Sequence, residues 1–182
     1  MKKIMLLIIV VISFISGCSN SEKVKESEYL YDYESLYAYK DTEMDNKTLE
    51  EIANLLLSKS DLDVDQAEWN DDIIYISYQM ELTEDNPKYA VDNQKIAQDS
   101  ILLFALFPKL EYVSIDYVQA DYAFASTLRK EQSEEIFGAD IDTYNVYAQG
   151  FSDEFIKKLE ELEYKQDIMD TVDYEHAILG IT

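Results

Sequence analysis

The stretch QDSILLFALFPKLEYVSIDYVQ, residues 98–119, combines the two sequence patterns that decide the fold. Its first half ends an apolar segment over residues 90–107, in which hydrophobic residues recur at helical spacing and cover most of the helix surface. Pro108 then ends the helix, because proline lacks the backbone N–H that a helix interior requires. Residues 111–119 alternate apolar and polar side chains, as in a strand with one buried face. The stretch predicts a buried helix followed directly by a half-buried strand.

A similar order of elements is predicted earlier in the chain. Residues 48–51, Thr-Leu-Glu-Glu, form a capping box, and apolar residues at helical spacing extend the expected helix to about Ser58. Residues 63–69 and 73–82 are then expected to form two strands, joined by the polar turn Asn70-Asp71-Asp72. This part of the chain therefore predicts one helix–strand–strand unit.

The same helix–strand–strand order follows a second time. The helix over residues 90–107 and the strand over residues 111–119 precede a further expected strand over residues 121–128. A short helix over residues 133–138 and an amphipathic helix capped by Ser152 complete the pattern. Two such units predict a two-layer α+β domain, in which an antiparallel sheet of about four strands packs against helices.

The N-terminus has the pattern of a bacterial lipoprotein signal peptide. Residues 1–18 combine two lysines, an apolar run over residues 4–12 and the sequence Ile15-Ser16-Gly17-Cys18, which ends at the only cysteine of the chain. The last four residues resemble a lipobox, which implies cleavage between Gly17 and Cys18 and lipidation of the Cys18 thiol. The alternative is an ordinary signal peptide followed by a free thiol.

These features predict a chain of four parts. Residues 1–17 are a cleaved signal peptide, and residues 18–36 are a lipidated, flexible tether. Residues 37–165 are the α+β domain, and residues 166–182 are a C-terminal tail whose structure the pattern does not define. The protein is therefore expected at the extracytoplasmic face of the cell membrane, held there by its lipid anchor.

The composition is strongly acidic. The 182 residues include 38 acidic and 15 basic side chains, which gives a formal net charge of −23. This balance argues against nucleic-acid binding, because that function depends on lysine and arginine neutralising phosphates. Anionic lipids and anionic wall polymers are also expected to repel the protein unless cations bridge the two surfaces.

A dense group of tyrosines lies at the junction of the expected tether and domain: Tyr29, Tyr31, Tyr33, Tyr37 and Tyr39. Alternation over the first three would place their rings on one face of a strand. One interpretation is an aromatic platform that binds a sugar or a partner protein. The other is an edge strand or a packed arm whose rings cover the domain.

A calcium site is the clearest metal hypothesis that the sequence offers. Asp61, Asp63 and Asp65 reproduce the alternating oxygen ligands that open an EF-hand loop, and Asp72 falls at the twelfth position. The sixth position is Gln66 rather than glycine, and a strand rather than a helix is expected to follow. The alternative is a row of acidic side chains on the solvent face of that strand.

Few residues offer catalytic chemistry. The chain has one cysteine and one histidine, His176, which does not supply a clustered zinc site or a recognisable nucleophile–base pair. Carboxylates are abundant, and two of them across a cleft suffice for glycoside hydrolysis. A carboxylate-pair hydrolase acting on cell-envelope glycans is therefore a further hypothesis, although the sequence does not single out the pair.

Three segments resemble an uncharacterised lipoprotein domain family of Gram-positive Firmicutes. They are Tyr39-Lys40-Asp41 before the first helix, the block DSILLFALF over residues 99–107, and Val113-Ser114-Ile115 before a hairpin. The resemblance covers roughly residues 37–138 and implies a helix that ends in a short loop before a strand. It implies no activity, ligand or catalytic residue.

The leading functional hypothesis is a non-enzymatic, membrane-anchored lipoprotein that presents an interaction or sensing domain. A protein partner in the cell envelope is expected, with the five tyrosines as the contact surface. The alternatives are a calcium-dependent binding domain that uses the Asp61, Asp63 and Asp65 cluster, and the carboxylate-pair hydrolase. Apart from that possible calcium, no cofactor is expected.

Overall fold

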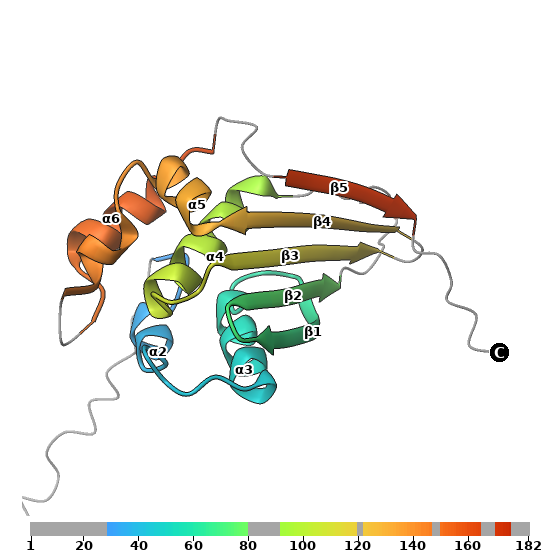
Figure 1. Ribbon diagram of the computed structural model, residues 1–182, viewed down its shortest axis with the longest axis horizontal. Coiled ribbons are helices and arrows are strands. Elements are labelled where there is room, and N and C mark those ends of the chain that lie inside the picture. The colour runs from blue at the N-terminus through green and yellow to red at the C-terminus, as the bar shows by residue number, and fades with distance from the viewer. Residues whose placement is uncertain (1–28, 80–91, 120–121, 147–149, 165–169, 176–182) are drawn as a thin grey trace, which may run out of the picture.

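The computed structural model describes residues 29–79, 92–119, 122–146, 150–164 and 170–175. The predicted signal peptide, Gly17 and Cys18 lie outside these residues and stay predictions. The described elements, shown in Figure 1, are α2 (Tyr33–Tyr37), α3 (Asn46–Leu56), β1 (Asp63–Asn70), β2 (Ile73–Gln79), α4 (Asn93–Leu106), β3 (Tyr112–Gln119), β4 (Tyr122–Arg129), α5 (Lys130–Phe137), the 3-10 helix η1 (Ile141–Val146), α6 (Asp153–Glu160) and β5 (Asp170–Glu175). Among the described helices, none has the length and apolar character needed to cross a membrane.

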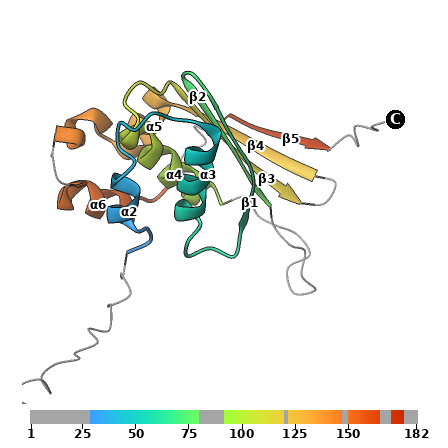
Figure 2. The same cartoon turned by 90° about the horizontal axis from the view of Figure 1, so that it is seen from below.

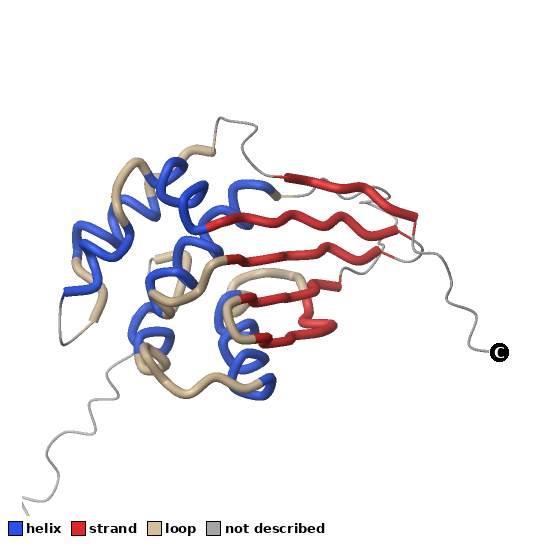
Figure 3. The backbone as a smooth tube through the Cα atoms, in the orientation of Figure 1, coloured by secondary structure: helices blue, strands red, loops and turns tan. Residues whose placement is uncertain are grey.

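The strands form one sheet in the order β1-β2-β3-β4-β5. Helices gather on one side of this sheet, as Figure 2 shows, so the predicted α+β class is confirmed. Two details differ from the expected antiparallel sheet of about four strands. First, β2 and β3 pair in parallel, because α4 carries the chain back along the sheet before β3 begins. Second, the C-terminal tail contributes a fifth strand, β5, which pairs antiparallel with β4 (Figure 3).

The core lies between the central strands and α4. On the helix-facing side of the sheet, Ile76 pairs with Ile115 and Tyr78 with Tyr117. All four side chains are buried, and so is every residue of α4 from Ile96 to Leu106. The last six residues of α4, Ile101 to Leu106, are all apolar, as a helix segment that is buried on all sides requires.

The helix N-termini agree only in part with the predicted caps. Ser152 caps α6, because its hydroxyl accepts from the backbone N–H of Phe155 at 3.1 Å, as expected. The expected capping box at Thr48 is wrong. The carboxylate of Asp45 caps α3 instead, accepting from the Thr48 N–H at 2.7 Å. The helix begins three residues early because Asp45 is itself a good N-cap and places Thr48 in the first turn.

Residues 29–36, which were expected to belong to a flexible tether, pack against the domain. Tyr31, Tyr33 and Leu36 are buried, and the segment ends in the short helix α2 rather than in the expected strand. The side chain of Asp32 caps α2 by accepting from the backbone N–H of Ser35. We call residues 29–39 the tyrosine arm. Burial of the Tyr31 and Tyr33 rings removes apolar area from water and favours this packing.

Candidate functional site

The tyrosine arm is attached by hydroxyl groups that reach three different helices. Tyr31 donates to Asp99 of α4 at 2.7 Å, and Tyr33 donates to Glu160 of α6 at 2.6 Å. Tyr39 donates to Glu51 of α3 at 3.1 Å. Each bond has a carboxylate acceptor, and hydrogen bonds to ionised groups are stronger than those between neutral groups. The arm therefore connects three helices that are far apart in the sequence.

The arm also forms one wall of a hollow of about 560 Å³, which we call the tyrosine hollow. It is lined by Tyr29, Tyr31, Asp32, Tyr33, Glu34, Tyr37, Ala38, Gly150, Phe151 and Ile156. The residues come from the arm and from the start of α6, so the hollow lies where the arm meets that helix. Aromatic side chains dominate this lining.

The aromatic rings of the hollow are fixed by one another. Phe151 meets the rings of Tyr33 and Tyr37 edge-on, with centroids 5.9 and 5.2 Å apart. Phe151 also stacks on the buried ring of Phe155, with ring centroids 5.1 Å apart and an interplanar angle of 15°. Both arrangements are among those that aromatic pairs prefer. Tyr29 completes the set, with its ring 5.8 Å from that of Tyr33. The aromatic wall of the hollow is therefore a continuous set of ring contacts that runs from Tyr29 to buried Phe155.

The structure divides the five predicted tyrosines between the two interpretations. Tyr31 and Tyr33 are buried and act as a packed arm. Tyr29 is 52% exposed and, with half-buried Tyr37, remains accessible at the hollow. Tyr39 does not line the hollow and instead contacts α3 through Glu51. The surface available to a partner is therefore made by Tyr29 and Tyr37.

Sequence reasoning missed Phe151 as part of this site. The signal was present, since Phe151 directly precedes the Ser152 cap and Ile156 lies at the fourth helical position. Apolar residues at these two places form the pattern of a hydrophobic staple, which sets the direction in which the chain enters a helix. Both residues line the hollow, so the staple and the tyrosine arm build it together.

A buried polar cluster lies behind the arm. The carboxylate of Asp99 is completely buried and accepts from Tyr31, from Tyr78 at 3.0 Å and from the ammonium of Lys95 at 3.0 Å. Burial raises the pKa of Asp99, because its charged form loses water, and Lys95 acts most strongly in the opposite direction. Lys95 also donates to the Leu56 carbonyl at 3.0 Å. The cluster fastens the arm to the core, and the sequence did not indicate it.

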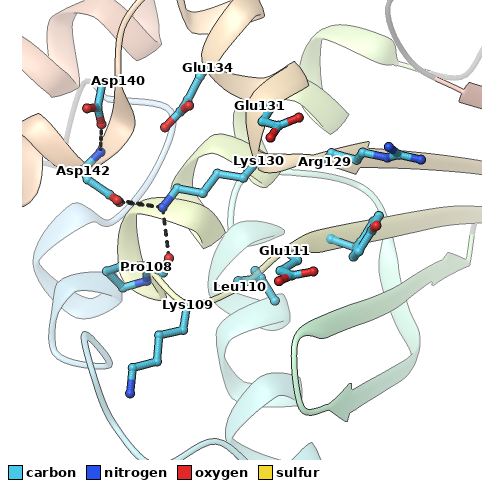
Figure 4. A pocket seen from close by; sticks show the side chains of 11 residues that line it. Pro108, Lys109, Leu110, Glu111, Arg129, Lys130, Glu131, Glu134, Asp140 and Asp142 are labelled. Carbon is cyan, nitrogen blue, oxygen red and sulfur yellow. Dashed lines mark hydrogen bonds and ion pairs between the residues drawn. The ribbon is translucent and has the colours of Figure 1, made fainter.

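A second hollow, of about 640 Å³, is a polar groove beside α5 (Figure 4). Lys130 lies at its centre and donates to both carboxylate oxygens of Asp142 at 2.8 Å and to the Pro108 carbonyl at 2.9 Å. Glu134 accepts from the Ile141 N–H, and Asp140 accepts from the Asp142 N–H. These charges fix the turn after α5. The geometry of this groove does not single out two of its acids as a catalytic pair. The carboxylate-pair hydrolase hypothesis stays a prediction.

The four aspartates of the calcium hypothesis are not brought together. Asp63 and Asp65 lie on extended strand β1, Asp61 precedes it, and Asp72 lies in the hairpin turn after it. A strand rises about 3.3 Å per residue, which separates Asp63 from Asp72 by roughly 20 Å. Within the described residues, no group of three or more acidic, histidine or cysteine side chains could hold a metal ion. The extended backbone therefore does not form the loop that the EF-hand spacing requires.

Comparisons with protein-family models, with curated proteins and with solved structures return no match for this chain. The resemblance to the Firmicute lipoprotein domain family stays a prediction. A functional conclusion therefore depends on the geometry of the tyrosine hollow, on the polar groups beside it and on the sequence of the N-terminus.

Proposed function

We propose that this chain is a lipid-anchored lipoprotein of the extracytoplasmic membrane face whose α+β domain binds another envelope protein. The observation that supports this most strongly is the tyrosine hollow. Tyrosine and phenylalanine are enriched in protein interfaces, where rigid rings bury a large area at a small entropy cost. Tyr29 and its neighbour Leu30, 52% and 47% exposed, are two of the three large hydrophobic residues exposed within the described chain. Both lie in the tyrosine arm.

The length of chain between Cys18 and the tyrosine arm limits how far the hollow can lie from the membrane. Residues 19–28 separate Cys18 from Tyr29, and an extended residue spans at most about 3.6 Å, so the distance from Cys18 to Tyr29 is no more than roughly 40 Å. With Cys18 acylated, the tyrosine hollow is held close to the bilayer. A partner that is itself embedded in or attached to the membrane fits this position best.

The anchor is tested by replacing Cys18 with serine. We expect the variant to lose incorporation of labelled palmitate and to leave the membrane fraction, because the serine hydroxyl does not take the place of the lipidated thiol. Metabolic labelling followed by fractionation measures both effects, and Ser16→Ala serves as the control with an intact cysteine. A variant that still incorporates palmitate would contradict the anchor.

The contact surface is tested by replacing Tyr29 and Tyr37 with serine, which leaves buried Tyr31 and Tyr33 in place. We expect a partner that is cross-linked to the wild-type protein in cells at near-equal amount to be lost from the double variant. Truncation of aromatic residues central to an interface typically costs about 2 kcal/mol or more of binding energy. Mass spectrometry of the cross-linked species measures the association.

The matched control for the tyrosine variants is Ile73→Ser. Ile73 is the third exposed large hydrophobic residue, 38% exposed, and it lies at the start of β2 rather than on the arm. We expect this control to retain the partner. Equal retention by the tyrosine double variant would place the contact elsewhere on the domain.

A further inference from the structure

Negative charge surrounds the tyrosine hollow. Asp32 and Glu34 line it with exposed carboxylates, and its described lining contains no lysine, arginine or histidine. Hydrogen bonds from Ser35 lower the pKa of Asp32, so this carboxylate stays ionised. Lys59 adds one positive charge at this edge, where its ammonium donates to the Tyr29 carbonyl, whereas the lining residues Asp32 and Glu34 supply two negative charges. The electrostatics of the hollow therefore favour a cation.

The aromatic rings of the hollow also favour a bound cation. The face of an aromatic ring carries negative potential and attracts a cation that lies within about 6 Å of its centre. The chain already uses this interaction on the inner side of the arm, where the Lys95 ammonium lies 5.2 Å from the ring centre of Tyr31. On the outer side, Tyr29 and Tyr37 offer rings next to Asp32 and Glu34. Aromatic rings and carboxylates at one site form a recognisable combination for binding cationic side chains.

We propose that the tyrosine hollow binds a segment of the partner protein that carries lysine or arginine. This inference rests on the proposed function and specifies the chemistry of the partner. The net charge of −23 supports it, because a strongly acidic protein attracts a basic segment over a distance and speeds its association. Tyr29 and Tyr37 would lie against the side-chain stems and charges of the segment, while Asp32 and Glu34 pair with its cationic groups.

The test uses the full-length protein in neutral detergent and two fluorescein-labelled heptapeptides. One peptide is Gly-Lys-Gly-Arg-Gly-Lys-Gly, and in the other glutamate replaces each cationic residue. Fluorescence anisotropy gives the dissociation constants and their dependence on salt. We expect the cationic peptide to bind and the acidic peptide not to bind.

Two double variants separate the contributions of charge and rings. Asp32→Asn with Glu34→Gln keeps a side chain that can cap α2 and removes both charges. Tyr29→Ser with Tyr37→Ser removes the accessible rings. We expect each pair to weaken binding of the cationic peptide at least about fivefold, and the charge pair to reduce the salt dependence as well. The control, Glu50→Gln with Glu131→Gln, removes two exposed charges outside the hollow and is expected to stay within about twofold of wild type.

The outcomes distinguish this inference from the proposed function. Equal weakening by all three pairs would show unspecific attraction to an acidic protein and would overturn the inference. Binding of the acidic peptide, or of neither peptide, would also overturn it. A cellular partner that is lost with the tyrosine pair but retained with the charge pair would leave the proposed function standing without a cationic segment. Cross-links from the hollow to a second copy of the chain would show that the hollow mediates self-association, and they would overturn the proposal of a basic partner segment.

Discussion

Replacing Lys95 with methionine is expected to lower the free energy of unfolding by about 3–5 kcal/mol at neutral pH. The substitution keeps most of the apolar stem but leaves the completely buried carboxylate of Asp99 without its cation. Tyr31 and Tyr78 still donate to this carboxylate, and neither carries a positive charge. Urea unfolding followed by far-UV circular dichroism measures the change.

The deficit of the Lys95→Met variant is expected to depend on pH. The pKa of Asp99 is raised by burial above its ordinary value of 3.8, and removing Lys95 raises it further. A carboxyl whose pKa is higher in the folded than in the unfolded chain destabilises the fold as pH rises above the unfolded value. The deficit should therefore be largest at neutral pH and shrink as pH falls through the raised pKa of Asp99 in the variant, because protonation then removes the unpaired buried charge.

Two further variants test this explanation. Lys47→Met breaks an exposed pair with Glu51 that has the same spacing along a helix, and we expect it to leave stability unchanged within error. Asp99→Asn in the Lys95→Met background removes the unpaired charge and is expected to recover part of the loss. If the two lysine variants had equal stability at neutral pH, the buried ion pair would not carry the predicted energy.

Replacing Phe155 with alanine is expected to destabilise the protein by about 3–5 kcal/mol, because it opens a cavity in the core. Phe155 is completely buried, stacks on Phe151 and lies 5.4 Å from the ring of Phe137. Its loss removes the support below the aromatic wall of the tyrosine hollow. Thermal and urea unfolding measure the stability.

The matched variant for Phe155→Ala is Phe155→Leu, which restores much of the lost volume. We expect the leucine variant to lose less than half as much stability as the alanine variant, because most of the cavity is filled. Partner association should fall with alanine more than with leucine if the stack positions Phe151. A cost below about 1 kcal/mol for alanine would show that the core closes around the gap.

Most of the elements were predictable because their patterns are local. The period of 3.6 residues over residues 90–107 and the period of two over residues 111–119 each report which side of an element is buried. The structure places α4 and β3 in these ranges. The start of α3 was predicted wrongly, since Asp45 and Thr48 are both acceptable caps and propensity alone does not choose between them. The strand in the tail, β5, was missed because its sequence signals are mixed.

The candidate site was predictable only as a group of residues. The clustering of tyrosines at the junction of the expected tether and domain pointed to this segment as a candidate, but not to the roles of its members. Tyr31 and Tyr33 could equally have faced a partner, because burial of a ring depends on what lies opposite it. The acceptors Asp99 and Glu160 lie 68 and 127 residues further along the chain. Nothing in a local pattern identifies partners at such separations.

The sequence by itself determined most of the helices and strands from α3 to α6 and their order, the acidic composition and the lipoprotein pattern at the N-terminus, since each depends on neighbouring residues or on composition. Only the tertiary structure decided that β2 lies parallel to β3, that the arm packs, and that Asp99 is buried beside Lys95. A pattern shows that a face is apolar, but the packing of the whole chain selects the surface that covers it. The tyrosine hollow exists for that reason, because it forms only where the arm meets α6.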